Sequence, residues 1–104
     1  MELKAAFGKV LNWVRVRGRF TQEDFSVVSS RTYISTLERG IYSPTLEKLE
    51  DISSVLKIHP ATLLVGSYAA KDGISVDEIL ARVKRELEEW QIPEAAGTIT
   101  EDLR

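Results

Sequence analysis

Cysteine is absent from the 104 residues, and histidine occurs once, as His59. The first absence excludes disulfides, thiolate catalysis and cysteine-ligated zinc, and it is typical of a reducing compartment. One histidine does not make a metal site, so we expect neither a metal nor another cofactor. No stretch approaches the roughly 18 apolar residues of a membrane span, and the first residues do not read as a secretion signal. The sequence therefore predicts a cytoplasmic protein with no membrane partner.

The residue sets of common enzymes are also missing. The sequence contains no nucleophile–His–acid set, no metal-ligand cluster and no Gly-rich phosphate loop. Asp51 lies near Glu47 and Glu50, but this pattern is more typical of a solvated helix face than of an acid–base pair. We therefore expect that the protein is not an enzyme.

Neither sign of charge dominates, and the net charge is -2. This value by itself does not indicate a nucleic-acid partner. The distribution is uneven: residues 1–65 contain nine Lys/Arg and seven Asp/Glu, whereas residues 66–104 contain five and nine. A slightly basic body is thus followed by an acidic C-terminal region. That region is a possible binding surface for a second protein.

Strand patterns are nearly absent, and helical spacing recurs instead. We predict five short helices up to residue 66. Gly18 ends the first, Thr21 begins the second, Ser30 and Thr45 cap the third and fourth, and Pro60 begins the fifth. Their apolar positions are Leu3, Phe7, Val10, Leu11, Val14, Phe25, Val28, Ile34, Leu37, Leu46, Leu49, Ile52, Val55, Leu56, Leu63 and Leu64.

The C-terminal third has a different pattern. Lys71-Asp72-Gly73 predicts a turn, Ser75 and Glu78 are spaced for a capping box, and a helix follows up to residue 90. Its apolar stripe consists of Val76, Ile79, Leu80, Val83, Leu87 and Trp90. Two interpretations stay open: the stripe packs back on the body, with Trp13 beneath it, or it joins two copies of the chain. We favour the second, because a self-contained five-helix body does not need another amphipathic helix, and so wide a stripe is costly to leave in water.

The predicted organisation has three parts. Residues 1–66 form a helical body, residues 67–92 a dimerisation helix, and residues 93–104 a flexible tail, since no periodicity follows residue 93. The fold class is therefore all-α: a five-helix bundle with an added C-terminal amphipathic helix.

Motifs of one family follow one another along the body. They are Phe7-Gly8-x-x-Leu11 with Arg15 and Gly18, Thr21-Gln22-Glu23-Asp24-Phe25, Tyr33-Ile34-Ser35-x-Leu37-Glu38-Arg39-Gly40, Ser43-Pro44-Thr45-Leu46-Glu47-x-Leu49, Ile52-x-x-Val55-Leu56, and His59-Pro60-x-x-Leu63-Leu64. In this order they resemble the helix-turn-helix family of phage repressors and Cro, also called the XRE family of bacterial regulators. The resemblance implies a lambda-repressor-like bundle whose third helix, residues 30–39, enters the major groove of DNA.

The body departs from the family at one place. From Thr21 to Gly40 the chain has 20 residues, two fewer than is usual in the family. The missing pair falls between the second and third helices, where residues 27–31 contain no glycine. The resemblance also implies that Arg15 pairs with Glu38 and pins the third helix to the body.

The third helix carries hydrogen-bonding side chains on the face away from Ile34 and Leu37. Arg31 can bind guanine with two hydrogen bonds, and threonine can bond a base or contact a thymine methyl group. Tyr33 either packs at the helix edge or reaches a phosphate. The candidate contacts on this helix are Arg31, Thr32, Tyr33, Ser35 and Thr36. Those at the second helix and in or near loops are Gln22, Tyr42, Ser43 and Lys48. Of these, we expect Gln22 and Lys48 to contact mainly phosphates.

These features predict a sequence-specific, double-stranded DNA-binding transcriptional regulator. The resemblance implies a homodimer on a palindromic operator. We expect a repressor, because occluding a promoter requires only binding. The alternative is a protein-interaction module or antitoxin-type partner-binding protein with the same fold. Salt-sensitive DNA binding distinguishes the two.

Overall fold

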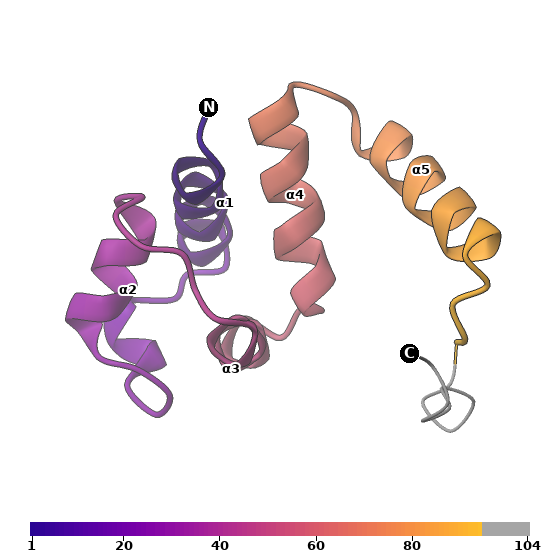
Figure 1. Ribbon diagram of the computed structural model, residues 1–104. Helices are drawn as coiled ribbons and strands as arrows, with labels where there is room; N and C mark the ends of the chain where they lie inside the picture. The colour runs from indigo at the N-terminus through magenta and orange to yellow at the C-terminus, as the bar shows by residue number, and fades with distance from the viewer. Residues whose placement is uncertain (95–104) are drawn as a thin grey trace.

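The computed structural model describes residues 1–94 and is built of helices (Figure 1). Their order is α1 Leu3–Arg17, the 3-10 helix η1 Gln22–Phe25, α2 Arg31–Glu38, α3 Leu46–Leu56, α4 Pro60–Asp72 and α5 Val76–Glu89. No strand occurs within residues 1–94, so the predicted all-α class is confirmed. Most of the predicted flexible tail, residues 95–104, lies outside the described residues.

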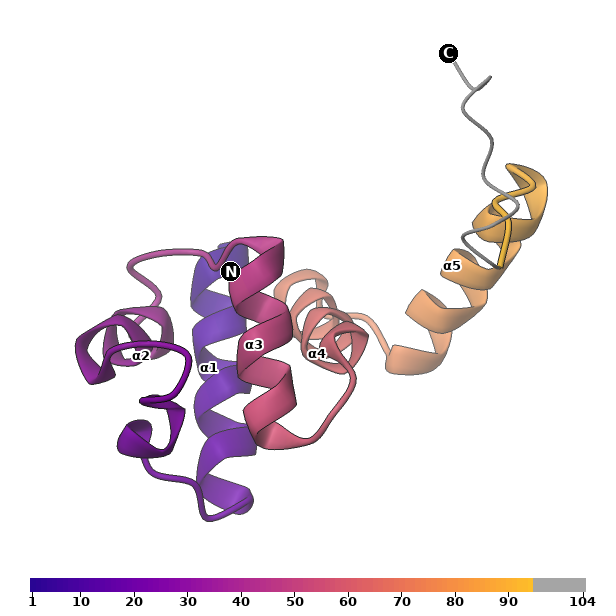
Figure 2. The ribbon, with the colours of Figure 1, turned by 90° about the horizontal axis from the view of Figure 1, so that it is seen from below.

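The hydrophobic core lies among the first five elements. α1 lies between α2 and α4, and α3 contacts α4 and η1 (Figures 1 and 2). The buried apolar cluster comprises Phe7, Leu11, Phe25, Ile34, Leu37, Leu49, Ile52, Leu56 and Leu63. All of these occupy predicted apolar positions, because steps of three and four place side chains on one face of a helix. The prediction is wrong for Leu46, the first residue of α3, which is 76% exposed.

Polar N-caps begin four elements as predicted. Each cap oxygen accepts a hydrogen bond from the backbone N–H three residues later, at 3.0–3.2 Å, and so pairs an otherwise unsatisfied donor. These caps are Thr21, Ser30, Thr45 and Ser75. A reciprocal capping box forms at Thr21 and Asp24, where none was predicted. At Ser75 and Glu78, where the box was predicted, only the Ser75 side chain accepts a hydrogen bond, from the Glu78 backbone N–H.

Two elements differ in length from the prediction. The second helix is a single 3-10 turn that ends at Phe25 and does not include Val28. α4 continues through Gly66 to Asp72, and Gly73 with φ 65° caps its end. The predicted boundary at residue 66 therefore falls inside a helix. A Cβ on Gly66 would lie 3.3 Å from Val10, so this glycine serves the close packing of α4 on α1.

The end of α1 has an unexpected conformation. Gly18 caps the helix as predicted, but it has right-handed helical angles, and the left-handed residue is Arg19, with φ 61°. A Cβ on Gly18 would lie 2.9 Å from the Phe20 ring. Glycine is therefore needed here for the contact with that ring and not for its backbone angles.

α5 projects away from the body and contacts α4 (Figures 1 and 2). None of its residues is buried, and Trp90 beyond its end is 78% exposed. The prediction that Trp13 packs beneath this helix is wrong. Trp13 is 64% exposed, and the guanidinium carbon of Arg17 lies 5.2 Å from the centroid of its ring.

A close approach of two backbones holds α1 against the end of α2. Gly8 is buried in α1, and a Cβ there would lie 2.4 Å from the carbonyl oxygen of Leu37 and 2.7 Å from that of Glu38. Backbone atoms cannot swing aside as side chains do. Any larger residue at position 8 must therefore displace α2 from α1.

We expect Gly8→Ala to lower the free energy of unfolding by about 1–3 kcal/mol, although alanine is the better helix former. Urea unfolding followed by circular dichroism measures this loss. Gly66→Ala is the matched control, because it gains the same helix propensity but its methyl group meets only the Val10 side chain. Equal losses in the two variants would show that the backbone approach is not the constraint.

Candidate nucleic-acid interface

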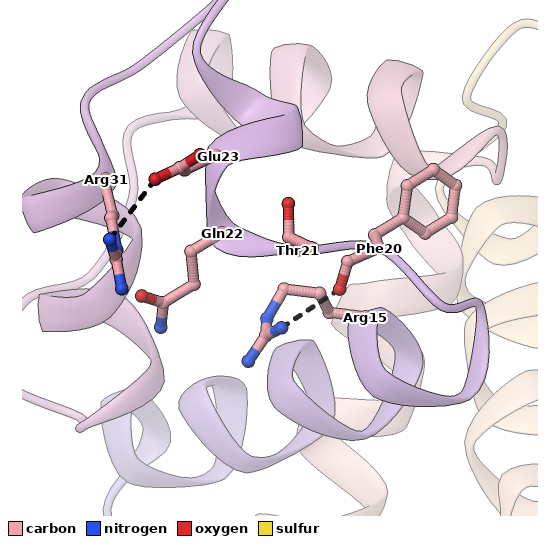
Figure 3. Close-up of a pocket in the computed structure, with 6 residues that line it drawn as sticks. All are labelled: Arg15, Phe20, Thr21, Gln22, Glu23 and Arg31. Carbon is pink, nitrogen blue, oxygen red and sulfur yellow. Dashed lines mark hydrogen bonds and ion pairs between the residues drawn. The ribbon is translucent and has the colours of Figure 1, made fainter.

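η1 and the start of α2 border an open hollow of 440 Å³ beside the end of α1 (Figure 3). Its lining residues are Arg15, Phe20, Thr21, Gln22, Glu23 and Arg31. The hollow brings together two of the predicted DNA contacts, Gln22 and Arg31. They come from the first residues of η1 and α2, which are the two elements that correspond to the predicted second and third helices.

The N-terminal end of α2 is its most accessible part. Its exposed candidates are Arg31 and Thr32, and its half-buried candidates are Tyr33, Ser35 and Thr36. Ile34 and Leu37 are buried on the opposite face, so packing fixes which side points outward. The Thr36 hydroxyl donates a 2.6 Å hydrogen bond to the Tyr33 carbonyl. The Thr36 hydroxyl can therefore only accept a hydrogen bond from a ligand.

Arg31 forms an ion pair with Glu23 of η1 at the edge of the hollow (Figure 3). Its Nη1 lies 3.3 Å from Oε1 of Glu23, and the two side chains are 69% and 73% exposed. A pair this exposed contributes little to stability. The remaining N–H donors of the guanidinium can meet another acceptor. No sequence pattern indicated Glu23 as the partner of Arg31.

Behind this face, the carboxylate of Glu38 joins α2 to the body. The Glu38 side chain is 6% exposed and accepts hydrogen bonds from Arg15 at 2.5 and 3.0 Å, from Asn12 at 3.0 Å and from Gln22 at 3.2 Å. Arg15 also donates to the Phe20 carbonyl at 3.0 Å. The structure thus contains the Arg15–Glu38 pair that the family resemblance implied.

Burial and hydrogen bonding act on Glu38 in opposite directions. Burial by itself raises the pKa of Glu38, but the hydrogen bonds from Arg15, Asn12 and Gln22 outweigh it, and the pKa lies below its ordinary value. The hydrogen bond with Glu38 raises the pKa of Arg15. Both groups are therefore charged at neutral pH, and the link between α1 and α2 is an ion pair.

Gln22 and Asn12 share this carboxylate. The Gln22 amide lines the hollow and gives one N–H to Glu38, which leaves its second N–H for a ligand. Asn12 was not among the predicted site residues. Its position three residues before Arg15 places both on one face of α1, and this spacing was the signal that could have found it.

Lys48 and Tyr33 lie together between α3 and α2. The Lys48 Nζ donates a 2.5 Å hydrogen bond to the Val28 carbonyl and lies 5.7 Å from the centroid of the Tyr33 ring. Both side chains are half-buried. Lys48 therefore makes contacts within the protein, in addition to any that it makes with a ligand.

Tyr42 and Ser43 lie apart from these residues, in the connection that follows α2. Both are exposed. Ser43 lines a different hollow of 100 Å³, whose other lining residues include Leu3 and Phe7. The structure therefore does not join these two candidates to the hollow of Gln22 and Arg31.

Residues 1–94 contain no group of three or more His, Asp or Glu residues that could hold a metal ion. None of their helices has the length and apolarity needed to cross a bilayer.

Comparisons with known proteins give two matches. The Helix-turn-helix family model matches residues 11–63, just over half of the chain. The crystal structure of the clp gene regulator ClgR from Corynebacterium glutamicum is similar over 90% of this chain and 98% of that chain, with 25% sequence identity and a TM-score of 0.62. This second similarity extends well beyond the residues that the family model matches. No curated protein matches the sequence.

We expect acid to weaken the fold through Glu38. Its pKa is lower in the folded chain than its ordinary value of 4.5, so the ionised carboxylate stabilises the fold above that pH. This contribution is lost as the pH falls from there through the lowered pKa. Urea unfolding of the wild type and of Glu38→Gln between pH 7 and pH 3 isolates the effect. The stability difference between the two proteins should shrink below about pH 4.5, and a constant difference would contradict the assignment.

Proposed function

The chain belongs to the XRE-type helix-turn-helix family, and from this premise we propose that it is a transcriptional regulator that binds double-stranded DNA. The observation that carries the proposal is the exposed start of α2. Arg31 and Thr32 lie there, and the buried Glu38 at the other end of the same helix ties it to the body. A rigid helix with exposed donors can present them to base edges in the major groove. The similarity to a gene regulator supports the same function.

Arg31 and Thr32 are the proposed base-reading residues. Both are exposed at the N-terminal end of α2, the end of a recognition helix that typically reaches base edges. Ser35, Thr36 and Tyr33 follow along the helix and are proposed as secondary contacts, because they are half-buried. Glu23 pairs with the Arg31 guanidinium at this face, and a guanine can accept two hydrogen bonds from the same group.

The proposed phosphate contacts surround α2. Gln22 has an N–H available at the start of η1, while Tyr42 and Ser43 are exposed beyond the opposite end of α2. The two groups therefore suit different stretches of the DNA backbone. Such contacts position the protein without reading sequence.

We further propose that α5 joins two copies of the chain into a homodimer. Its predicted stripe is exposed at Val76, Leu80, Val83, Leu87 and Trp90, and half-buried at Ile79. Two mainly apolar hollows, of 410 and 550 Å³, flank it, one toward α4 and one toward residues 91–94, and Leu80 lines both. A second copy of α5 crossing at Leu80 would fill these hollows. Side chains of this kind contribute roughly 1.5–3 kcal/mol each when fully buried.

The proposed organisation follows from these roles. A helix-turn-helix body reads DNA, and the C-terminal helix joins two such bodies on a palindromic operator, where the dimer acts as a repressor by occlusion. The other candidate is a partner-binding module of the same fold, and the observation that favours it is the exposed stripe with its acidic neighbours. Selection of duplexes from a random pool at low salt tests the proposal: a regulator selects a symmetric site, whereas a partner-binding module selects none.

We expect Arg31→Ala to weaken binding to a selected duplex by about 1–3 kcal/mol and to relax the preference at one base position of each half-site. Fluorescence anisotropy on the selected duplex and on its single-base variants measures both effects. Arg82→Ala is the matched control, because Arg82 also has a side chain 69% exposed and an ion pair at 3.3 Å, with Glu86 of α5. Unchanged affinity and preference in Arg31→Ala would remove this residue from the reading surface.

Leu80→Glu tests the proposed dimer. A charge at the centre of the stripe should shift the protein from dimer to monomer, because burying an unpaired carboxylate is costly. Sedimentation equilibrium at micromolar concentration measures this shift. Ala81→Glu adds the same charge to an exposed neighbouring position outside the stripe and should leave the dimer intact. A wild-type chain that is monomeric under these conditions would show that α5 has another role.

A further inference from the structure

The connection between η1 and α2 has few internal restraints. It comprises residues 26–30, contains no glycine, and carries Val27 84% exposed at its outer side. The backbone N–H groups of Val28 and Ser29 both donate to the Phe25 carbonyl, at 2.9 and 2.8 Å. No backbone N–H within residues 1–94 donates to the Val28 carbonyl. The main chain therefore leaves the Val28 carbonyl for a side chain.

Lys48 supplies the missing donor from a different part of the fold. Its backbone N–H is held by the Thr45 cap at 3.1 Å, so the residue is fixed in the first turn of α3. Its Nζ reaches the Val28 carbonyl at 2.5 Å. A hydrogen bond from a charged donor is stronger than one between neutral groups.

The same ammonium group also contacts α2. It lies 5.7 Å from the centroid of the Tyr33 ring, within the range of a cation–π interaction. Tyr33 belongs to the first turn of α2, directly after Arg31 and Thr32. One cation thus joins α3, the connection and the proposed reading end of α2.

We propose that Lys48 is a positioning residue for DNA recognition: through the Val28 carbonyl and the Tyr33 ring it sets the placement of the start of α2 relative to η1. The inference rests on the proposed function. It assigns Lys48 a different role from the phosphate contact expected from the sequence. The two roles differ in their consequences. A positioning residue affects duplexes that α2 reads and spares non-specific binding, whereas a phosphate contact contributes to both.

Anisotropy titrations of Lys48→Met with two labelled duplexes distinguish these roles. One duplex is the site that the wild type selects from a random pool, and the other has the same length and random sequence. We expect about a tenfold loss on the selected duplex, the scale of one charge-assisted hydrogen bond. Affinity for the random duplex and the salt dependence should stay unchanged. Lys48→Arg, which keeps a cationic donor, should recover most of the loss.

Equal losses on both duplexes, with a salt slope reduced by roughly one unit, would overturn the positioning role in favour of a phosphate contact. Lys57→Met is the control, because Lys57 is an exposed lysine at the other end of α3. If Lys48→Met does not fold, Lys48→Gln replaces it in the same comparison. A wild-type chain that selects no duplex overturns the proposed function and this inference together, whereas a phosphate result overturns the inference alone.

Discussion

The placement of α2 depends on the buried ion pair between Arg15 and Glu38. Glu38 is the last residue of α2, where the helix dipole disfavours a negative charge, and burial disfavours it further. Arg15, Asn12 and Gln22 together provide the donors that make this position tenable. Because three residues from two other elements donate four hydrogen bonds to one carboxylate, the end of α2 has one well-defined position on the body.

The two ends of α2 are held by different means. At the C-terminal end, the glycine of α1 lets two backbones touch and the buried pair lies beside them. At the N-terminal end, a cap, an exposed ion pair and the contacts of Lys48 replace hydrophobic burial. An isolated helix of eight residues is marginal in water. Tertiary contacts therefore stabilise α2 while its reading end stays accessible.

α5 differs from α2, because its apolar residues have few contacts with the body. The body buries its own apolar faces in one cluster, but the stripe of α5 stays exposed beside two mainly apolar hollows. So much accessible apolar surface on a small chain is characteristic of a binding surface. In the proposed function, the body therefore determines which DNA sequence is bound, and α5 determines how many copies of the chain bind it.

The sequence by itself determined the helix starts and the buried faces, but not every helix length or type. The core positions, the caps at Thr21, Ser30, Thr45 and Ser75, and the fold class all follow from interactions within a few residues, such as helical spacing and cap bonds. Only the tertiary structure decided the single 3-10 turn at η1, the continuation of α4 through Gly66 and the exposure of Trp13. It also decided the inward contacts of Gln22 and Lys48 and the pairing of Arg31 with Glu23. These features depend on which elements meet, and no local spacing encodes a contact between side chains of different elements.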